Sequence, residues 1–516
     1  MNRCSIRTNP TRSTMLSESA ETTTEAETDA KPEPPDRELR LTATTVQQLR
    51  DALLQEDGNE RIAFGYCTRS GDDYLLHEVS VLEDPEHAVS EPTACRADEA
   101  VERSHVSTAA ETDRDLFIIH SHPFTDEAAF SLTDDDMLAR FRNWLQPLFP
   151  ETHLLFGVLG RHNLRVQRLT ADGTYTGLPV NVLGNWTLDP PLPADAPAAT
   201  DVDWEKHDRS IRALGLDGQQ LLADAHVAVV GCGGIGSHLV TGLARLGVDA
   251  LTLVDPDEVE TSNLPRLSGA QHGDVGRAKT AVMQQLAVLA NPDLETHIIA
   301  DKVQNAEDHL KKVDLVVAGL DRLLPRSWLN EFCTRHLIPY IDAGTVISID
   351  DVEHVTAEET FVQTVIPGVT GCFDCLNRLD NERLRLETRD EQEQLEMLDE
   401  GYIEGTDLTP AAAVLPLNLT AVAATLNTVV DVVTERRPPV DFLRMDQVTN
   451  EHVPISTQRS PSCVACGDNG VLAAGETVDA EAALPDKPLE PLFDRDAADV
   501  TGAEPLFAIE DEGQGL

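Results

Sequence analysis

Four cysteines form two Cys-x-x-Cys pairs that lie far apart in the chain, and their spacing is typical of a metal site. Cys372 and Cys375 make the first pair, and Cys463 and Cys466 make the second. Four thiolates suit a closed tetrahedral zinc site, which has no position left for a catalytic water. A redox role for a single pair is the alternative, but the presence of two pairs favours structural zinc. The nine cysteines come without a secretory signal, so we expect a reducing, cytoplasmic location.

A second set of possible metal ligands lies nearer the N-terminus. An apolar run from Leu116 ends in His120-Ser-His122-Pro, and Ser131 and Asp134 follow at the start of a helical pattern. Two imidazoles and a carboxylate are typical of zinc sites whose fourth position holds water. The alternative is purely structural, because Ser131 and Asp134 would also cap the helix while the histidines bind nothing.

A third set of residues is suited to binding phosphate. The segment 226–237, HVAVVGCGGIGS, runs from a buried-strand pattern into a glycine-rich turn and then a helical pattern. Backbone N–H groups can approach a phosphate at the helix N-terminus because the turn contains Gly231, Gly233, Gly234 and Gly236. Asp255 ends the next apolar run and can accept hydrogen bonds from ribose hydroxyls. Alone, this pattern also fits an NAD-dependent dehydrogenase or a structural turn.

The residues that follow Asp255 argue against NAD. Asn263, Arg266 and Lys279 come next, and Asp321 follows a later apolar run. An enzyme that splits ATP between its α- and β-phosphates needs cations on the departing pyrophosphate and a carboxylate for Mg²⁺. A dehydrogenase needs neither.

With these motifs, the chain from about 204 to 467 resembles the ubiquitin-activating superfamily, the ThiF/MoeB/HesA adenylyltransferases. The resemblance implies an ATP-dependent homodimer in which Arg209 reaches the ATP of the neighbouring subunit. It also implies that the turn glycines and Asp255 hold the nucleotide, that Asp321 binds Mg²⁺, that the four cysteines bind structural zinc, and that the triphosphate is faced by Asn263, Arg266 and Lys279. Leu267 departs from the Gln usual in the family. The implied partner is a small ubiquitin-like or sulfur-carrier protein that ends in Gly-Gly.

The charged segment between the cysteine pairs should cross over the tail of that partner. Many family members carry a nucleophilic cysteine there, whereas the matching position here is Tyr402, and 376–462 contains no cysteine. We therefore expect an acyl-adenylate without an enzyme thioester in this loop.

The N-terminal motif resembles that of JAB/JAMM metalloproteases, in which a Glu precedes His-x-His-Pro and Ser-x-x-Asp. The resemblance implies cleavage of peptide or isopeptide bonds beside the same kind of tail. The implied roles are zinc ligands at His120, His122 and Asp134, a base at Glu60, and an oxyanion donor at Ser131. The spacing from His122 to Asp134 is one residue longer than usual, and the competing carboxylates are Asp135, Asp136, Glu56 and Glu78.

The elements that must position these residues divide the chain into an α/β protein with several parts. We expect disordered acidic termini at 1–37 and 471–516, a JAB/MPN-type α/β domain at 38–184, a proline-rich linker at 185–203, and a Rossmann-like doubly wound adenylating domain at 204–470. Apolar patterns predict strands at 39–42, 60–67, 74–82 and 116–122, and helices at 45–54 and from 131. The apolar stretch 411–433 contains Pro416, Asn418 and Asn427, which favours a buried helix over a membrane span.

The chain is strongly acidic along its whole length. Its 516 residues carry a formal net charge of −50, from 90 acidic and 40 basic residues. This charge argues against binding nucleic acid through a basic face. It is typical of proteins that stay hydrated in molar salt, so we expect a halophilic protein.

Two other functions remain open from the sequence. In one, only the metalloprotease domain is active and the adenylating domain recognises the tail. In the other, the chain is a scaffold that binds ATP and zinc and recruits partners through the repeated Pro-Leu-Phe at 491–493 and 505–507.

Overall fold

Two eight-stranded sheets dominate the structure, a computed structural model that describes residues 38–145, 152–170, 173–192, 202–349, 354–389, 393 and 412–477. All strands of the first sheet precede residue 184, and all strands of the second follow residue 225. We call these parts the N-terminal and C-terminal modules. Residues 1–37 and 478–516, which were predicted as disordered, lie outside the described residues, as do 193–201 of the linker and most of the predicted crossing loop. The prediction of disorder from 471 is wrong for 471–477, because Ala473 and Ala474 are buried and the Ala473 N–H donates to the Thr334 carbonyl at 3.2 Å.

The first sheet mixes parallel and antiparallel pairs. Its spatial order is β10 (Val180–Leu183), β1 (Leu39–Thr42), β3 (Asp73–Val81), β2 (Ile62–Ser70), β6 (Asp115–Ser121), β7 (Leu154–Leu159), β8 (Leu164–Leu169) and β9 (Tyr175–Leu178). A separate hairpin joins β4 (His87–Glu91) to β5 (Ala94–Ala97). The module also contains α1 (Ala43–Leu53), α2 (Glu99–Glu111) and α3 (Leu132–Leu145).

Alternation along β6 fills both faces of this sheet. Phe117 and Ile119 pack in the core under α1, whereas Leu116 and Ile118 pack in the core that contains residues of α2 and α3. Because successive side chains of a strand point to opposite faces, the continuous apolar run predicts a strand buried on both sides. The structure confirms that strand, which carries His120 at its end.

Two predicted boundaries in this module are shifted by side-chain and hairpin contacts. The first helix begins at Ala43 rather than Thr45, because the Thr42 hydroxyl accepts a hydrogen bond from the Thr45 N–H at 3.1 Å and so caps it. Glu60 precedes β2 instead of starting it. Its N–H donates to the Glu91 carbonyl at 2.9 Å, which ties it to the β4–β5 hairpin.

The second sheet has the predicted Rossmann-like order with an antiparallel extension. Five parallel strands run β13 (Glu295–Ile299), β12 (Ala250–Val254), β11 (His226–Val230), β14 (Leu315–Ala318) and β15 (Tyr340–Ile349). The sheet then continues antiparallel through β16 (Val355–Val365), β17 (Phe442–Asp446) and β18 (Glu451–Ile455). The chain leaves β11 for β12 on one side and reaches β14 on the other, so the strand order reverses at β11.

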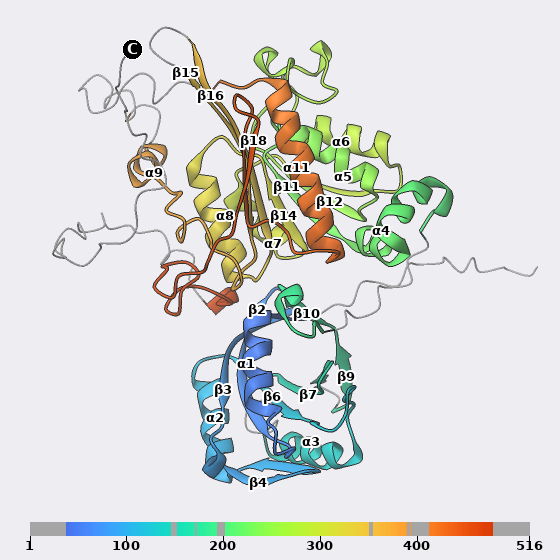
Figure 1. Cartoon of the computed structure of the whole chain (residues 1–516), viewed down its shortest axis with the longest axis vertical. Helices are drawn as coiled ribbons and strands as arrows, with labels where there is room; N and C mark the ends of the chain where they lie inside the picture. The colour runs from blue at the N-terminus through green and yellow to red at the C-terminus, as the bar shows by residue number, and fades with distance from the viewer. Residues whose placement is uncertain are drawn as a thin grey trace, which may run out of the picture. The chain divides into compact units, whose positions relative to one another are not determined.

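Helices cover both faces of this sheet (Figure 1). One core joins Val227 and Val229 to α5 (Gly236–Leu246), α6 (Lys279–Ala290) and α11 (Leu415–Thr434). The opposite core joins Ala228 and Val230 to α8 (Leu323–Arg335), with the short α7 (Glu307–Leu310) at its edge. Within the described ranges, the other α-helices of this module are α4 (Trp204–Asp224), which packs on α11, and α9 (Asn381–Glu387).

The predicted buried helix at 411–433 is α11. It packs against β15, β16, α4 and α5. Among the described residues it is the one helix whose length and composition would let it cross a bilayer, and 50% of its most apolar window is buried inside the protein. These contacts are those of a core helix.

A buried histidine at the amino end of β11 should make the stability of the fold depend on pH. His226 lies there with its Nε2 2.8 Å from the Thr252 hydroxyl, and its ring centroid is 5.6 Å from that of His297. Burial, with a smaller contribution from His297, lowers the pKa of His226 from 6.5 to about 4. Between these values the unfolded chain binds a proton that the native protein does not, so stability falls as the pH drops through this window.

We predict that His226→Gln removes part of this acid sensitivity. The free energy of unfolding, measured with urea from pH 7.5 down to pH 4.5, should fall less steeply in the variant, by about 1–3 kcal/mol over the window. The two proteins should show the same slope above pH 7. Identical slopes below pH 6.5 would contradict the burial of a neutral imidazole.

Candidate functional site

The expected phosphate turn lies where the strand order of the second sheet reverses. Open α/β sheets bind ligands at this switch point, outside the carboxyl ends of the strands. Gly231 directly follows β11, Asp255 directly follows β12, and Asp321 comes three residues after the last residue of β14. The topology therefore brings three residues from distant parts of the sequence to one edge.

Two glycines of the turn are required by close backbone approach. Gly231 has φ +85°, and a Cβ there would lie 2.8 Å from the Gly319 carbonyl oxygen. A Cβ at Gly236 would lie only 1.7 Å from the Gly231 carbonyl oxygen. The turn thus needs glycine at both ends, whereas a Cβ at Gly233 would meet nothing within 4 Å. Helix α5 starts at Gly236 without a side-chain cap. Its Ser237 and His238 N–H groups donate to the carbonyls of Gly233 and Ile235, at 3.0 and 3.1 Å, so the donors for a ligand are the N–H groups of the turn that precedes them.

Asp255 is fixed at the foot of this turn. Its Oδ2 accepts from the Cys232 N–H at 2.6 Å, and its Oδ1 accepts from the Asp257 N–H at 2.8 Å. The side chain is buried, and burial raises the pKa of its carboxyl. The carboxylate is therefore held in one orientation beside the turn, as an acceptor for ribose hydroxyls requires.

Lys279 points into the same region from the start of α6. Its Nζ lies 2.8 Å from Asp257 Oδ2 and 3.9 Å from Asp255 Oδ1. Burial alone would lower the pKa of Lys279, but the carboxylates of Asp255 and Asp257 outweigh it, and the pKa rises. The charge of Asp321 adds to that rise.

The remaining predicted nucleotide residues lie on the loop after β12, with one exception. Asn263 is buried and accepts from the Glu260 N–H at 3.1 Å, and Arg266 donates to the Ser262 carbonyl at 2.9 Å. Leu267 is buried in the core that contains α5, so an apolar contact takes the place of the family's Gln. Arg209 is exposed on α4. Among the described residues, no hydrogen bond or ion pair joins it to the turn.

The histidines and aspartate of the N-terminal module converge on one point. His120 Nε2 lies 3.0 Å from Asp134 Oδ1 and 3.2 Å from His122 Nε2, and His122 Nε2 lies 3.6 Å from Asp134 Oδ2. Zinc bonds of about 2.0–2.1 Å place tetrahedral ligand atoms about 3.4 Å apart, so this set fits a zinc ion. His120 and Asp134 are buried, and His122 is nearly so.

Glu60 is the carboxylate that the structure brings to this set. Ile62 pairs with His120 in the antiparallel β2–β6 ladder, so Glu60, two residues earlier, lies across from His122. Glu60 Oε1 is 3.9 Å from His122 Nε2. Burial raises the pKa of Glu60, and the histidines oppose the rise. Glu56 is exposed, and Glu78 pairs with Arg114 instead.

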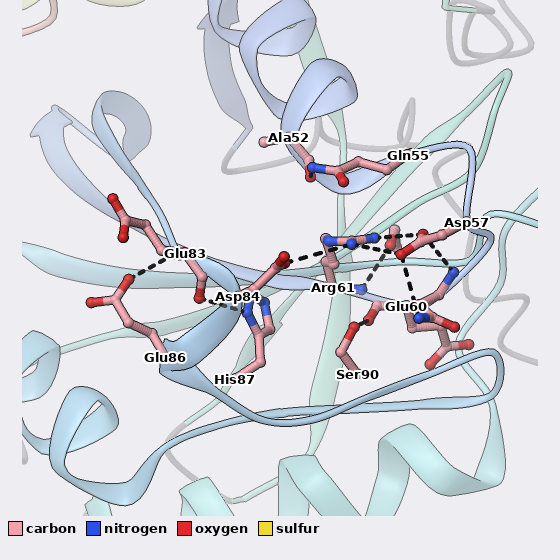
Figure 2. Close-up of polar contacts among 12 residues, drawn as sticks. Ala52, Gln55, Asp57, Glu60, Arg61, Glu83, Asp84, Glu86, His87 and Ser90 are labelled. Carbon is pink, nitrogen blue, oxygen red and sulfur yellow. Dashed lines mark hydrogen bonds and ion pairs between the residues drawn. The ribbon is translucent and has the colours of Figure 1, made fainter.

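The backbone of Glu60 is held from both sides (Figure 2). The Ser90 hydroxyl donates to the Glu60 carbonyl at 3.1 Å. The next residue, Arg61, donates to both carboxylate oxygens of Asp57, at 2.9 and 2.8 Å, and lies 3.7 Å from Asp84. Hydrogen bonds and ion pairs therefore hold the segment that carries Glu60, the candidate base, although it lies outside a strand.

Ser131 and Asp134 also make the capping pair that the structural alternative predicts. The Ser131 N–H donates to Asp134 Oδ2 at 2.6 Å, and the Asp134 N–H donates to the Ser131 hydroxyl at 3.3 Å. The capping pair and the convergence with the histidines coexist, because they use different lone pairs of one carboxylate. Asp135 is exposed, and the side chain of Asp136 lies outside the description.

The four cysteines form a compact cluster without a disulfide. The sulfur–sulfur distances are 3.8 Å for Cys372–Cys375, 3.5 Å for Cys372–Cys463 and 3.3 Å for Cys375–Cys466. Zinc–sulfur bonds of about 2.3 Å give tetrahedral edges of about 3.8 Å, so the cluster fits one zinc ion. Hydrogen bonds from the other thiols, chiefly Cys466, lower the pKa of Cys372 to about 5.

Sequence reasoning missed two polar residues at the candidate nucleotide-binding edge. Asp257 follows Asp255 closely, and the Asp-Pro-Asp doublet was a visible signal. Asn418 contacts the turn from α11, and its only signal was a polar residue in an apolar helix. Tyr402, predicted at the position of the family's nucleophile, lies outside the described residues.

We predict that Gly236→Ala and Gly233→Ala differ sharply although they lie in one turn. The first places a methyl group against the Gly231 carbonyl and should lower the free energy of unfolding by about 2 kcal/mol or more, with loss of nucleotide binding. The second meets open space and should stay within about 1 kcal/mol of the wild type. Chemical denaturation of both variants tests this, and equal stability of the two would disprove the close contact.

Comparisons with known proteins identify relatives of this chain. Curated relatives include the tRNA threonylcarbamoyladenosine dehydratases of Haemophilus influenzae (36% identical, 24% of this chain, 48% of that protein) and Escherichia coli (35% identical, 26% of this chain, 51% of that protein). The chain thus spans about half the length of these relatives. The sulfur carrier protein ThiS adenylyltransferase of E. coli is 31% identical over 34% of this chain and 68% of that protein.

Solved structures that resemble the chain include E. coli MccB with MccA-N7isoASN, at a TM-score of 0.42 and 24% identity over 52% of this chain and 76% of that chain. The protein-family model described as "ThiF family" matches residues 207–465, about half of the chain. The chain belongs to the ThiF family.

Proposed function

We propose that the C-terminal module adenylates the C-terminal carboxylate of a small ubiquitin-like or sulfur-carrier protein that ends in Gly-Gly. The observation that carries the proposal is the meeting of the glycine turn, Asp255, Lys279 and Asp321 at the switch point of the sheet. Relatives named as adenylyltransferases, such as the ThiS adenylyltransferase, support it.

The reaction joins the carboxylate to AMP. An oxygen of the carboxylate attacks the α-phosphorus of ATP, the bond to the β-phosphate oxygen breaks, and pyrophosphate leaves. The turn N–H groups would hold the phosphates, and Asp255 would hold the ribose. Lys279, with Arg266, would neutralise the charge that develops on pyrophosphate, and Asp321 would bind Mg²⁺. Exposed Arg209 would act on a second subunit of a homodimer.

We further propose that the N-terminal module is a zinc amidase that cuts beside the same kind of tail. The supporting observation is the convergence of His120, His122 and Asp134 with Glu60 across the ladder. Zinc, when bound, would supply Lewis acidity for water and for the scissile carbonyl. Glu60 would accept the proton of the attacking water and deliver it to the leaving amine. Ser131, one turn from Asp134, would help to stabilise the oxyanion.

The four-cysteine cluster would hold a second, structural zinc ion. It joins a segment just after β16 to one just after β18. A closed set of four sulfur ligands has no open position for chemistry, so this zinc would hold the two segments together.

Two alternatives to adenylation both predict that the C-terminal module does not turn over ATP. If the C-terminal module only recognised the tail, or only bound ATP as a scaffold, the cations around the turn would bind nucleotide without turnover.

A tRNA substrate, as the names of two relatives suggest, is disfavoured by the net charge of −50 because polyanions are repelled.

We predict ATP–pyrophosphate exchange that depends on a small protein ending in Gly-Gly. The assay should contain molar KCl, because the acidic chain is expected to be halophilic. Asp321→Ala should reduce the exchange at least about 100-fold, because the carboxylate for Mg²⁺ is lost. Exchange that is absent with every Gly-Gly protein, from a folded and zinc-loaded sample, would reject the adenylation.

We predict two zinc ions per chain that can be removed separately. His120→Ala should lose one ion and all cleavage of a fusion at the Gly-Gly junction, yet keep ATP–pyrophosphate exchange. Cys375→Ser should lose the other ion and unfold at lower temperature, because metal binding contributes to folding. Elemental analysis and both activity assays measure this. A His120→Ala variant that retains both ions would rule out the N-terminal zinc site.

A further inference from the structure

Asn418 is a buried side chain that the proposed reaction does not yet use. It lies in the first turn of α11 and is 2% exposed. Its Oδ1 accepts from the hydroxyl of Thr345, on β15, at 3.4 Å. This contact orients the amide so that the nitrogen, Nδ2, points away from β15.

The nitrogen points at the phosphate turn. A Cβ at Gly234 would lie 2.5 Å from Asn418 Nδ2, and the next closest atom would be Arg266 Cδ, at 3.2 Å. The amide and the arginine therefore pack against the same residue of the turn. Within the described part of the chain, Asn418 Nδ2 has no hydrogen-bond acceptor.

The surroundings of this amide favour an anion as its acceptor. Helix α11 begins at Leu415, so the positive end of its dipole lies beside Asn418. The amino end of α5 lies in the same turn. Two helix amino ends, the side-chain stem of Arg266 and an amide donor thus meet at Gly234. A phosphate oxygen would supply an acceptor for this donor.

We propose that Asn418 donates a hydrogen bond to a phosphate oxygen of the bound nucleotide, and to the same group in the acyl-adenylate. This inference rests on the proposed adenylation, since it assigns another ligand in the same site. It also gives Gly234 a role distinct from that of Gly231 and Gly236. Any side chain at Gly234 would displace the amide from the phosphate.

The test compares three ligands on one variant. Calorimetry with MgATP, AMP and adenosine should be run on the wild type and on Asn418→Asp, which keeps the shape but replaces the donor with a carboxylate. We expect ATP and AMP to bind at least about tenfold more weakly, because a charge-assisted hydrogen bond becomes a repulsion. Adenosine, which lacks phosphate, should bind within about twofold of the wild type.

Two further variants serve as a matched control and as a fallback for this test. Asn427→Asp makes the same change on the same helix at an exposed position and should leave all three affinities unchanged. If Asn418→Asp unfolds, Asn418→Ala should still weaken ATP and AMP more than adenosine. Equal weakening of all three ligands, or of none, would overturn the role of Asn418. A wild type that binds no ATP would instead overturn the adenylation itself.

Discussion

The proposed nucleotide site depends on one contact that leaves no room for a side chain. The start of α5 lies so close to the end of β11 that a Cβ at Gly236 would meet the Gly231 carbonyl at 1.7 Å. Because the helix can come this close, the turn that leads into it lies at the edge of the sheet where β12 and β14 also end. Strand order and helix approach therefore fix the site together.

Electrostatics at this edge are arranged around a shared lysine. Lys279 lies between Asp255 and Asp257, and the charge of Asp321 also contributes to raising its pKa. A buried ammonium group without carboxylates would lose its proton more readily, so the acids keep Lys279 charged before a nucleotide arrives. In the proposed site, a phosphate would have to compete with Asp257 for the ammonium group, whereas Asp255 is held by two backbone N–H groups. Asp257 and Asp321 are exposed, and their carboxylates are suited to binding a divalent cation.

The sequence predicts the parts of these sites that depend on local spacing. The glycine turn, Asp255 at a strand end and the two cysteine pairs are all readable because each depends on a few consecutive residues. The choice of Glu60 over Glu56 and Glu78 depends on strand pairing and on the β4–β5 hairpin, which spacing does not encode. Asn418 and Leu267 depend on how α11 and the loop after β12 approach the turn. Such tertiary contacts are not visible in a single sequence.

The pairing of Ile62 with His120 limits how the first sheet can vary in evolution. Side chains alternate along a strand, so a slip of one residue between β2 and β6 would turn Glu60 away from His122. Insertions or deletions inside these two strands are therefore incompatible with the constellation. The turn between β4 and β5 lies beyond Ser90 and Glu91, which brace Glu60, so its length is free to change. Homologous chains that keep this centre should differ in length at such turns and stay constant along the β2–β6 ladder.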